Sequence, residues 1–288
     1  MGANGRFWPY RTGAMQVFVY GLPRILLPRT TVNKPRSRLA CELDQSSLLE
    51  APMCVMADHA TCGTLILKTR PQKGRRMVRK ILLICGIFSS VLYIVSDVLG
   101  TLRYPGYSYT DQEFSELTAQ GSPVRPLMIA LNEIPYTLLV VAFAVGIWES
   151  AGLRRAGRIT AAMLIGYAVI IGMVTGVIFP MPTREVLAAG EGTLRNAMHP
   201  PGTIVMSLFI VLAMVFGSTL LGKRFRYYSY GTILTLIVFG VLTSLQVGQM
   251  EANQPTPWMG LEERINIYAT MLWVAVLAIG LLRAQKAR

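Results

Sequence analysis

Hydrophobic residues in this chain are gathered into six long runs, and short charged clusters separate the runs between Ile81 and Leu282. A helix that is apolar around its whole circumference lies in lipid or in a large core, whereas a surface helix keeps one polar face. Runs of about 20 residues, at a rise of about 1.5 Å per residue, are long enough to cross about 30 Å of hydrocarbon. The pattern therefore predicts an all-α fold, a polytopic membrane helix bundle with six transmembrane helices at residues 81–100, 127–148, 159–179, 201–222, 230–250 and 265–282.

The charged clusters predict how the bundle is oriented. Basic residues gather before the first run, between the second and third, between the fourth and fifth, and after the sixth, while acidic residues dilute the basic ones in the alternate loops. Loops rich in Lys and Arg stay on the cytoplasmic side of a membrane. All basic clusters fall on one side, so we expect both ends of the bundle in the cytoplasm (N-in/C-in) and the protein in the cell inner membrane.

Composition agrees with a membrane protein. Of 288 residues, 52% are hydrophobic and 15% are charged, which is too apolar for an ordinary soluble domain. The net charge of +13 would suit a nucleic-acid-binding protein, but residues 1–76 hold 12 Lys/Arg against 4 Asp/Glu, and most of the other basic residues flank the runs. We therefore expect membrane lipid, and no nucleic acid, as a partner. Whether the protein forms a homo-oligomer is left open by the sequence.

Residues 1–76 differ from the rest of the chain. They are rich in Arg, Pro, Ser and Thr, and they contain no apolar run long enough to span a bilayer. Such a segment cannot bury enough surface to offset its chain entropy, so one interpretation is a disordered basic extension. The favoured interpretation is an over-long start, with translation beginning at Met77, because a short basic start followed by a span is typical of bacterial membrane proteins. In both cases residues 77–288 form the six-span bundle.

Two carboxylic acids, Asp97 and Glu133, lie inside the predicted spans, one or two turns from their outer ends. A charge at the centre of a bilayer costs at least about 2.5–3.5 kcal/mol on insertion scales, so each acid is a candidate for a functional site. His199, just before the fourth run, titrates near neutrality and is a candidate general base or metal ligand. The alternative is structural: the two acids would pair with Arg264 or Arg125, and His199 would cap a helix end.

The runs carry no signature of a metal or a cofactor. His199 is the single histidine after residue 76, and a catalytic zinc normally takes three protein ligands, so no metal is expected. Nucleotide-binding loops and hydrolase elbows are absent from the sequence, so no cofactor is expected. Gly172 and Gly176 form a small-xxx-small pattern in the third run, which predicts tight packing against a neighbouring helix.

The first outer loop carries a recognisable string, YPGYSYTDQEFSELTAQGSPVRPLM, at residues 104–128. Together with FP at 179–180, His199 and GLEERI at 260–265, it resembles a bacterial and archaeal membrane family, domain of unknown function 998 (DUF998), over residues 77–284. The resemblance implies a fold and a topology rather than a reaction. It singles out outer polar positions, namely Tyr107, Ser115, Glu116, His199, Glu262, Glu263 and Arg264.

The chain departs from the family pattern in two loops. Thr118 follows the SEL segment where glycine is expected, and Thr183 and Arg184 stand where an acidic residue is expected.

Three functions are consistent with the sequence. The leading hypothesis is a non-enzymatic bundle that binds lipid, senses or scaffolds, which needs only the spans and a shallow outer pocket. The second is a membrane-embedded hydrolase acting on lipid or envelope substrates, with Asp97, Glu133 and His199 as acid/base groups. The third is a small-solute or ion carrier, against which the shallow position of the polar groups counts. Convergence of these three side chains in one water-filled cavity would separate the hypotheses.

Overall fold

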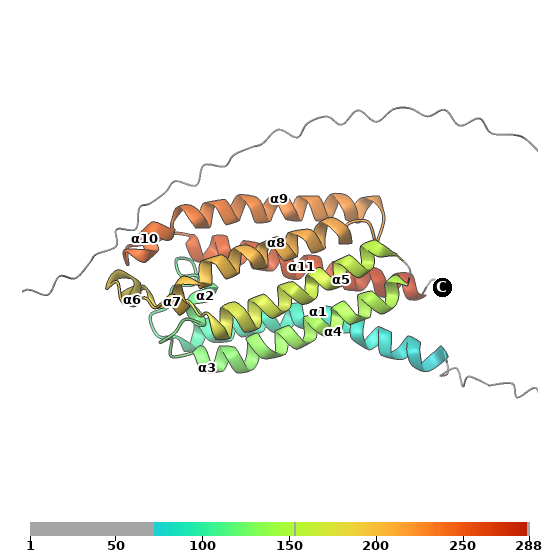
Figure 1. The fold of residues 1–288 in the computed structure, drawn as a ribbon, viewed down its shortest axis with the longest axis horizontal. Coiled ribbons are helices and arrows are strands. Elements are labelled where there is room, and N and C mark those ends of the chain that lie inside the picture. Colours follow the sequence, from blue (N-terminus) through green and yellow to red (C-terminus); the bar gives the residue numbers. More distant parts are fainter. Residues whose placement is uncertain (1–71, 153, 287–288) are drawn as a thin grey trace, which may run out of the picture. The chain divides into compact units, whose positions relative to one another are not determined.

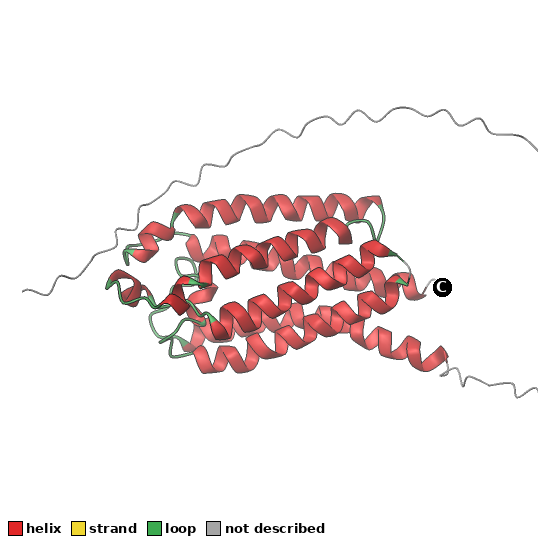
Figure 2. Cartoon of the chain, in the orientation of Figure 1, coloured by secondary structure: helices red, strands yellow, loops and turns green. Residues whose placement is uncertain are grey.

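The computed structural model describes residues 72–152 and 154–286, which are mostly helical, with loops joining the helices (Figure 2). Six helices are long and apolar enough to cross a membrane, at Gly74–Arg103, Arg125–Ala151, Arg155–Ile178, Leu194–Gly217, Lys223–Glu251 and Met259–Lys286. The predicted all-α, six-span bundle is confirmed. Most of the predicted extension, residues 1–76, lies outside the described residues, so both interpretations of it stay predictions.

The spans are built from the following elements. α1 (Gln72–Arg103) is the first span, and α3 (Arg125–Met128), η1 (Ile129–Glu133) and α4 (Ile134–Ala151) form the second. The third comprises α5 (Arg155–Val169) and η2 (Ile170–Ile178), and the fourth α7 (Leu194–Ala197) and α8 (His199–Gly217). α9 (Lys223–Leu245) with α10 (Val247–Glu251) forms the fifth, and α11 (Met259–Lys286) is the sixth. The short helices α2 (Phe114–Leu117) and α6 (Arg184–Ala188) lie in connecting segments.

The connecting segments at one end of the bundle form a cap, defined here as residues 104–124, 179–198 and 246–258. The helices α2, α6, α7 and α10 lie in it, on the left of Figure 1. The start of α1 and the end of α11 lie at the opposite end, which we call the base. An even number of spans brings both ends of the bundle to the same side. The assignment of that side to the cytoplasm stays a prediction.

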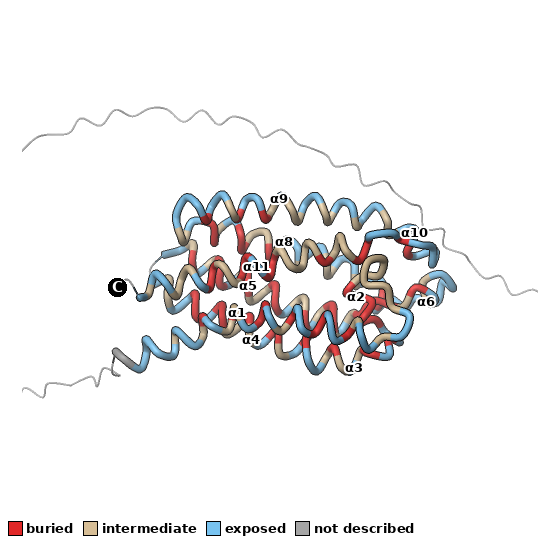
Figure 3. Tube along the Cα trace, turned by 180° about the vertical axis from the view of Figure 1, so that it is seen from behind, coloured by how far each residue is buried: buried red, intermediate tan, exposed pale blue. Residues whose placement is uncertain are grey.

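The order of the spans in space differs from their order in the sequence. α8 packs on α5, α5 on α4, α4 on α1, α1 on α11, and α11 on α9. The first and last spans are therefore neighbours, and α9 leans on α11 more than on α8, which precedes it. In the most apolar stretch of α9 only 6% is buried, against 22–44% in the other spans. Figure 3 accordingly shows α9 as mostly exposed.

Glycines in the third span let it approach the second very closely. A Cβ atom at Gly172 would lie 1.9 Å from the hydroxyl oxygen of Thr137, and one at Gly176 would lie 2.5 Å from a carboxyl oxygen of Glu133. A methyl group at either position would force Thr137 or Glu133 to move. The tight packing predicted from the small-xxx-small pattern is confirmed.

The same contact brings together the two π-helical segments, η1 and η2. Pro135 stands in the first turn of α4 and has no N–H to donate to the carbonyl four residues back, so an α-helical hydrogen bond is missing within η1. In η2 the hydroxyl of Thr175 donates to the carbonyl oxygen of Ile171 at 2.8 Å. Such wide turns are frequent at functional sites.

The fifth span begins earlier than predicted. The predicted start was residue 230, but α9 begins at Lys223 and includes Arg224 and Arg226. Long basic side chains cover apolar surface with their stems and extend their charged ends to water. The helix can therefore continue past the hydrocarbon through residues that sequence reasoning assigns to a loop.

Candidate functional site

An ion pair between Arg264 of α11 and Asp97 of α1 lies where the first and last spans meet the cap. Nη2 of Arg264 is 2.9 Å from Oδ1 of Asp97, and Nε is 3.0 Å from Oδ2. The two side chains are 1% and 0% exposed. Two-pronged, charge-assisted hydrogen bonds of this kind are among the strongest in proteins. Asp97 is thus paired with Arg264, as the structural interpretation expects.

The other donors of Arg264 hold the first connecting segment of the cap. Nη1 donates to the carbonyl oxygens of Tyr109 and Gln112, both at 2.9 Å, and Nη2 donates to the hydroxyl of Tyr107 at 2.8 Å. The guanidinium also lies 3.9 Å from the ring centre of Tyr109, a cation–π contact. Burial raises the pKa of Tyr107 and outweighs the opposite effect of Arg264, so this hydroxyl stays protonated and donates to the carbonyl of Glu113 at 2.6 Å.

The second oxygen of Asp97 is shared with a tyrosine. The hydroxyl of Tyr268 donates to it at 2.5 Å, and this hydroxyl lies 2.8 Å from the hydroxyl of Tyr109. Both oxygens of the carboxylate are thus engaged by side chains of α11. Asp97 could act as an acid or a base only if this network opened.

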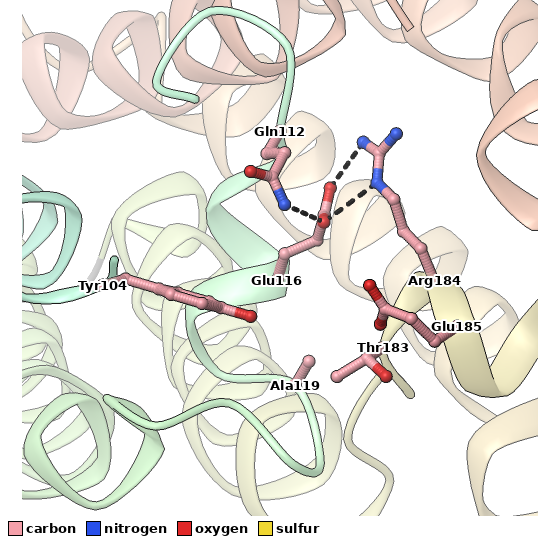
Figure 4. Close-up of a pocket in the computed structure, with 7 residues that line it drawn as sticks. All are labelled: Tyr104, Gln112, Glu116, Ala119, Thr183, Arg184 and Glu185. Carbon is pink, nitrogen blue, oxygen red and sulfur yellow. Dashed lines mark hydrogen bonds and ion pairs between the residues drawn. The ribbon is translucent and has the colours of Figure 1, made fainter. Parts of the chain in front are cut away.

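A second ion pair, between Glu116 and Arg184, lies inside the cap (Figure 4). Nη2 of Arg184 is 2.7 Å from Oε1 of Glu116, and Nε is 3.0 Å from Oε2. Arg184 also donates to the hydroxyl of Thr256 at 2.9 Å and to the carbonyl of Asp111 at 3.1 Å. One side chain therefore ties all three connecting segments of the cap together.

A shallow cleft lies beside this second ion pair and has a volume of about 20 Å³. A space of this size takes about one water molecule, so the cleft as described is too small for a substrate. Burial and the charges of Glu185 and Glu116 raise the pKa of Tyr104, whose hydroxyl faces the cleft (Figure 4). The lining residues are Tyr104, Gln112, Glu116, Ala119, Thr183, Arg184 and Glu185.

The remaining residues of the outer polar positions are bound within the cap as well. Glu263 accepts a hydrogen bond from the backbone N–H of Phe114, and Glu262 accepts one from the side chain of Gln246 at 2.9 Å. α11 is therefore joined to the first connecting segment and to the end of the fifth span by adjacent carboxylates.

Glu113 carries a perturbed carboxyl group next to these residues. The hydroxyl of Ser115 donates to it at 3.2 Å. Burial, together with the charges of Glu263 and Glu116, raises the pKa of Glu113 well above its usual range. Burial and the neighbouring carboxylates therefore favour the protonated form of Glu113.

Glu133 lies apart from these networks, between η1 and η2. It is 4% exposed, and its one side-chain hydrogen bond comes from the amide of Asn132 at 3.4 Å. The amide oxygen of Asn132 accepts from Ser96 of α1 at 2.9 Å. Glu133 forms no ion pair with any residue in the described part of the chain.

The prediction that Glu133 pairs with Arg264 or Arg125 is wrong. Arg264 is occupied by Asp97 and the cap. Arg125 donates to backbone carbonyl oxygens, those of Thr118 and Val177, instead of to the carboxylate. Arg125 is thus engaged by backbone oxygens, which lack helical partners at the ends of helices.

His199, at the start of α8, caps the end of η2. Its Nδ1 is 2.9 Å from the carbonyl oxygen of Phe179, and since a carbonyl can only accept, Nδ1 carries the proton. Arg195 donates to another carbonyl of the same helix end at 2.8 Å. Cations and donors are stabilising at a helix C-terminus. Within the described residues His199 has no hydrogen bond to Asp97 or Glu133, so these three candidates have separate partners.

Three of the network residues that sequence reasoning missed are Tyr268, Arg184 and Tyr109. Tyr268 lies one turn after Arg264 on the same helix face, a spacing that could have indicated it. Arg184 was noted only as a departure from the family pattern, although an arginine in a connecting segment that also carries acidic residues is a signal of pairing. Tyr109 contributes through its carbonyl oxygen and ring face, for which the sequence has no specific signal.

A six-span helical bundle with a cap fastened by two buried ion pairs is a polytopic membrane protein. The chain belongs to the family described as Protein of unknown function (DUF998), which matches residues 63–280. The resemblance seen in the sequence is thereby confirmed. No curated protein and no solved structure matches the chain.

Proposed function

We propose that the protein is a non-enzymatic scaffold of the cell inner membrane, whose six spans hold a rigid polar cap at the outer face. The observation that carries this proposal is the arrangement around Arg264. One buried guanidinium joins α1, α11 and the first connecting segment, and each of its three nitrogen atoms is engaged. A catalytic acid or base must reach a proton of its substrate, whereas these charged groups are used to fix the backbone of the cap.

The outer surface of the cap supports the same proposal. Trp258 is 60% exposed and has a φ of 72°, a backbone conformation that bulky residues rarely adopt. Its backbone N–H donates to the carboxylate of Asp111 at 3.3 Å. Hydrogen bonds from Ser108 and from this N–H lower the pKa of Asp111. A strained residue persists only where its surroundings fix it, so the cap presents Trp258 in a defined place.

Photo-cross-linking in cells tests the scaffold proposal. A photoreactive residue at Trp258 should give a discrete protein product, whereas one at Leu234, on the exposed face of α9, should give lipid adducts. Arg264→Lys keeps the charge but removes the planar fork, so it should abolish the product while the protein still inserts. Glu133→Gln should leave the product unchanged. The proposal would be contradicted if the photoreactive residue at position 258 gave only lipid adducts. It would also be contradicted if the cross-linked protein product were lost in Glu133→Gln and kept in Arg264→Lys.

One observation favours the carrier alternative. Glu133 is a buried carboxyl that has no ion pair within residues 72–152 and 154–286, and it lies where two π-helical segments meet near the cap. Ionisable groups in such places are frequent in proton and ion pathways. A carrier predicts that purified protein in vesicles conducts protons, measured with an enclosed pH-sensitive dye, and that Glu133→Gln abolishes the flux. Flux equal to that of empty vesicles would remove this alternative. The hydrolase alternative has no comparable support, because its three proposed acid/base groups have separate partners.

A further inference from the structure

The base of the bundle contains a second cleft, between the end of α4 and the start of α5. Its volume is about 40 Å³, against about 20 Å³ for the cleft in the cap. Ser150 and Arg154 supply polar lining, and Leu220 and Leu281 supply an apolar wall. The positive charge of Arg154 at the entrance of the cleft is complementary to an anionic lipid headgroup, and the side chains of Leu220 and Leu281 are complementary to the start of its acyl chains.

Two buried polar atoms toward the base have no hydrogen-bond partner among the described residues, namely Nε of Arg79 and Oε1 of Gln285. The amide nitrogen of Gln285 donates to Ser150 at 3.3 Å, which brings its unpaired oxygen near the cleft. Arg79 lies at the same level, because Leu82 packs against Gly146 and one turn toward the base from this contact leads to Arg79 and Ser150. Buried polar atoms are nearly always paired, so the unpaired oxygen of Gln285 beside the cleft and the unpaired N–H of Arg79 at the same level are each open to a ligand.

The surroundings of the cleft are cationic. Among residues 74–152 and 154–286, Glu149 is the only acidic residue at the base, and both ion pairs of the described structure lie near the cap. Arg158 lies over the ring of Trp148 at 5.7 Å instead of pairing with an acid. The basic residues at this end are Arg75, Arg76, Arg79, Lys80, Arg154, Arg155, Arg158, Lys223, Arg224, Arg226, Arg283 and Lys286. Basic pockets between spans attract anionic lipid headgroups.

We propose that the mouth of the cleft at the base binds an anionic phospholipid whose headgroup carries a free hydroxyl, as that of phosphatidylglycerol does; the cleft itself admits only part of the headgroup. The phosphate accepts hydrogen bonds from Arg154 and Arg79, and a headgroup hydroxyl donates to Oε1 of Gln285. The first turn of α5, whose N-cap is Arg154 and which no side chain of the described residues caps, adds backbone N–H groups at the same mouth. Phosphatidylcholine has no hydroxyl and would bring a cation toward the arginines. This inference is independent of the scaffold proposal.

Native mass spectrometry of the full-length protein, delipidated in mild detergent, tests the proposal with phosphatidylglycerol and phosphatidylcholine as probes. Phosphatidylglycerol should bind at least about tenfold more tightly, the size of one charge-assisted hydrogen bond. Arg154→Gln should weaken this binding by about tenfold for the same reason. Arg224→Gln also removes one positive charge at the base, but outside the cleft. General surface attraction contributes roughly a fivefold change in affinity per charge, so Arg224→Gln should weaken phosphatidylglycerol binding by less than this.

Two further arms distinguish a specific site from a general attraction of anions to the base. Arg79→Lys keeps the charge but removes the Nε–H donor, so the preference for phosphatidylglycerol should fall while thermal unfolding in detergent stays unchanged. Soluble glycerol phosphate in excess should not displace the lipid, because it has no acyl chain for the apolar wall. Equal losses in Arg154→Gln and Arg224→Gln, equal binding of the two lipids, or displacement by glycerol phosphate would each overturn the proposal.

Discussion

Replacing Asp97 by Asn removes the negative charge beside Arg264 and keeps the shape of the side chain. The guanidinium would remain buried without a counter-charge, and the new amide N–H groups would face the donors of Arg264 and Tyr268. Removing one partner of a buried ion pair costs about 3–5 kcal/mol. A neutral hydrogen bond between membrane helices is worth only about 0.6 kcal/mol on average. We therefore expect Asp97→Asn to lower the free energy of unfolding by about 3–5 kcal/mol.

Reversible unfolding in mixed micelles, followed by tryptophan fluorescence, measures this change. Hydrogen exchange should also speed up in residues 104–113, because Arg264 holds the carbonyl oxygens of Tyr109 and Gln112 there. Glu262→Gln is the matched control: it removes a charge from the same helix, and its one side-chain hydrogen bond, from Gln246, is worth about 1 kcal/mol. A loss below about 1 kcal/mol for Asp97→Asn, with unchanged exchange in the cap, would refute the reasoning from a desolvated ion pair.

Three further changes have defined outcomes. Gly172→Ala places a Cβ 1.9 Å from the hydroxyl oxygen of Thr137, so the free energy of unfolding should fall by about 1–3 kcal/mol in the same assay. Gly231→Ala is the control, because a Cβ there would meet no described atom within 4 Å, and it should not destabilise the protein. Because the pKa of Glu113 is raised in the folded state, stability should fall as the pH rises from the ordinary value toward the raised one, and Glu113→Gln should flatten this fall in melting temperature. Reporter fusions test the orientation of the bundle. Fusions after Arg158 and Arg226 should report a cytoplasmic position, and fusions near Gln120, Gly190 and Asn253 should report an external one. A fusion at the C-terminus that reports an external position would contradict the predicted orientation.

Most of the fold could be predicted because its signal lies along the chain. The length of an uncharged run is set by the thickness of hydrocarbon, and the basic clusters mark its ends. The neighbours of each span could not be predicted, since lipid and protein are equally apolar surroundings for a helix. The packing of α9 on α11 is one example, and the helical start of α9 at Lys223 is another.

The candidate site was predictable only where charge had to be balanced. A buried Asp97 requires a cation at a similar depth in the membrane. Arg264 lies near the start of the last span, at the same end of the bundle, and was one of the two candidate partners predicted from the sequence. Glu133 shows the limit of this reasoning, because glycine contacts and π-helical turns surround it instead of a cation. A π-helical turn has no periodic signature, and Pro135 was its one local sign.

The ion pair at Arg264 also has a consequence for synthesis of the chain. Its two residues are 167 positions apart. At roughly 5–20 residues per second, Asp97 waits about 8 to 33 s for its counter-ion after the ribosome has passed it. During that time the first span holds an unpaired acid, and the bundle stays open because α11 arrives last. Since α9 also leans on α11, a chain that loses its last span keeps both an unpaired acid and an unsupported helix. These are two defects by which membrane quality control could recognise an unfinished protein.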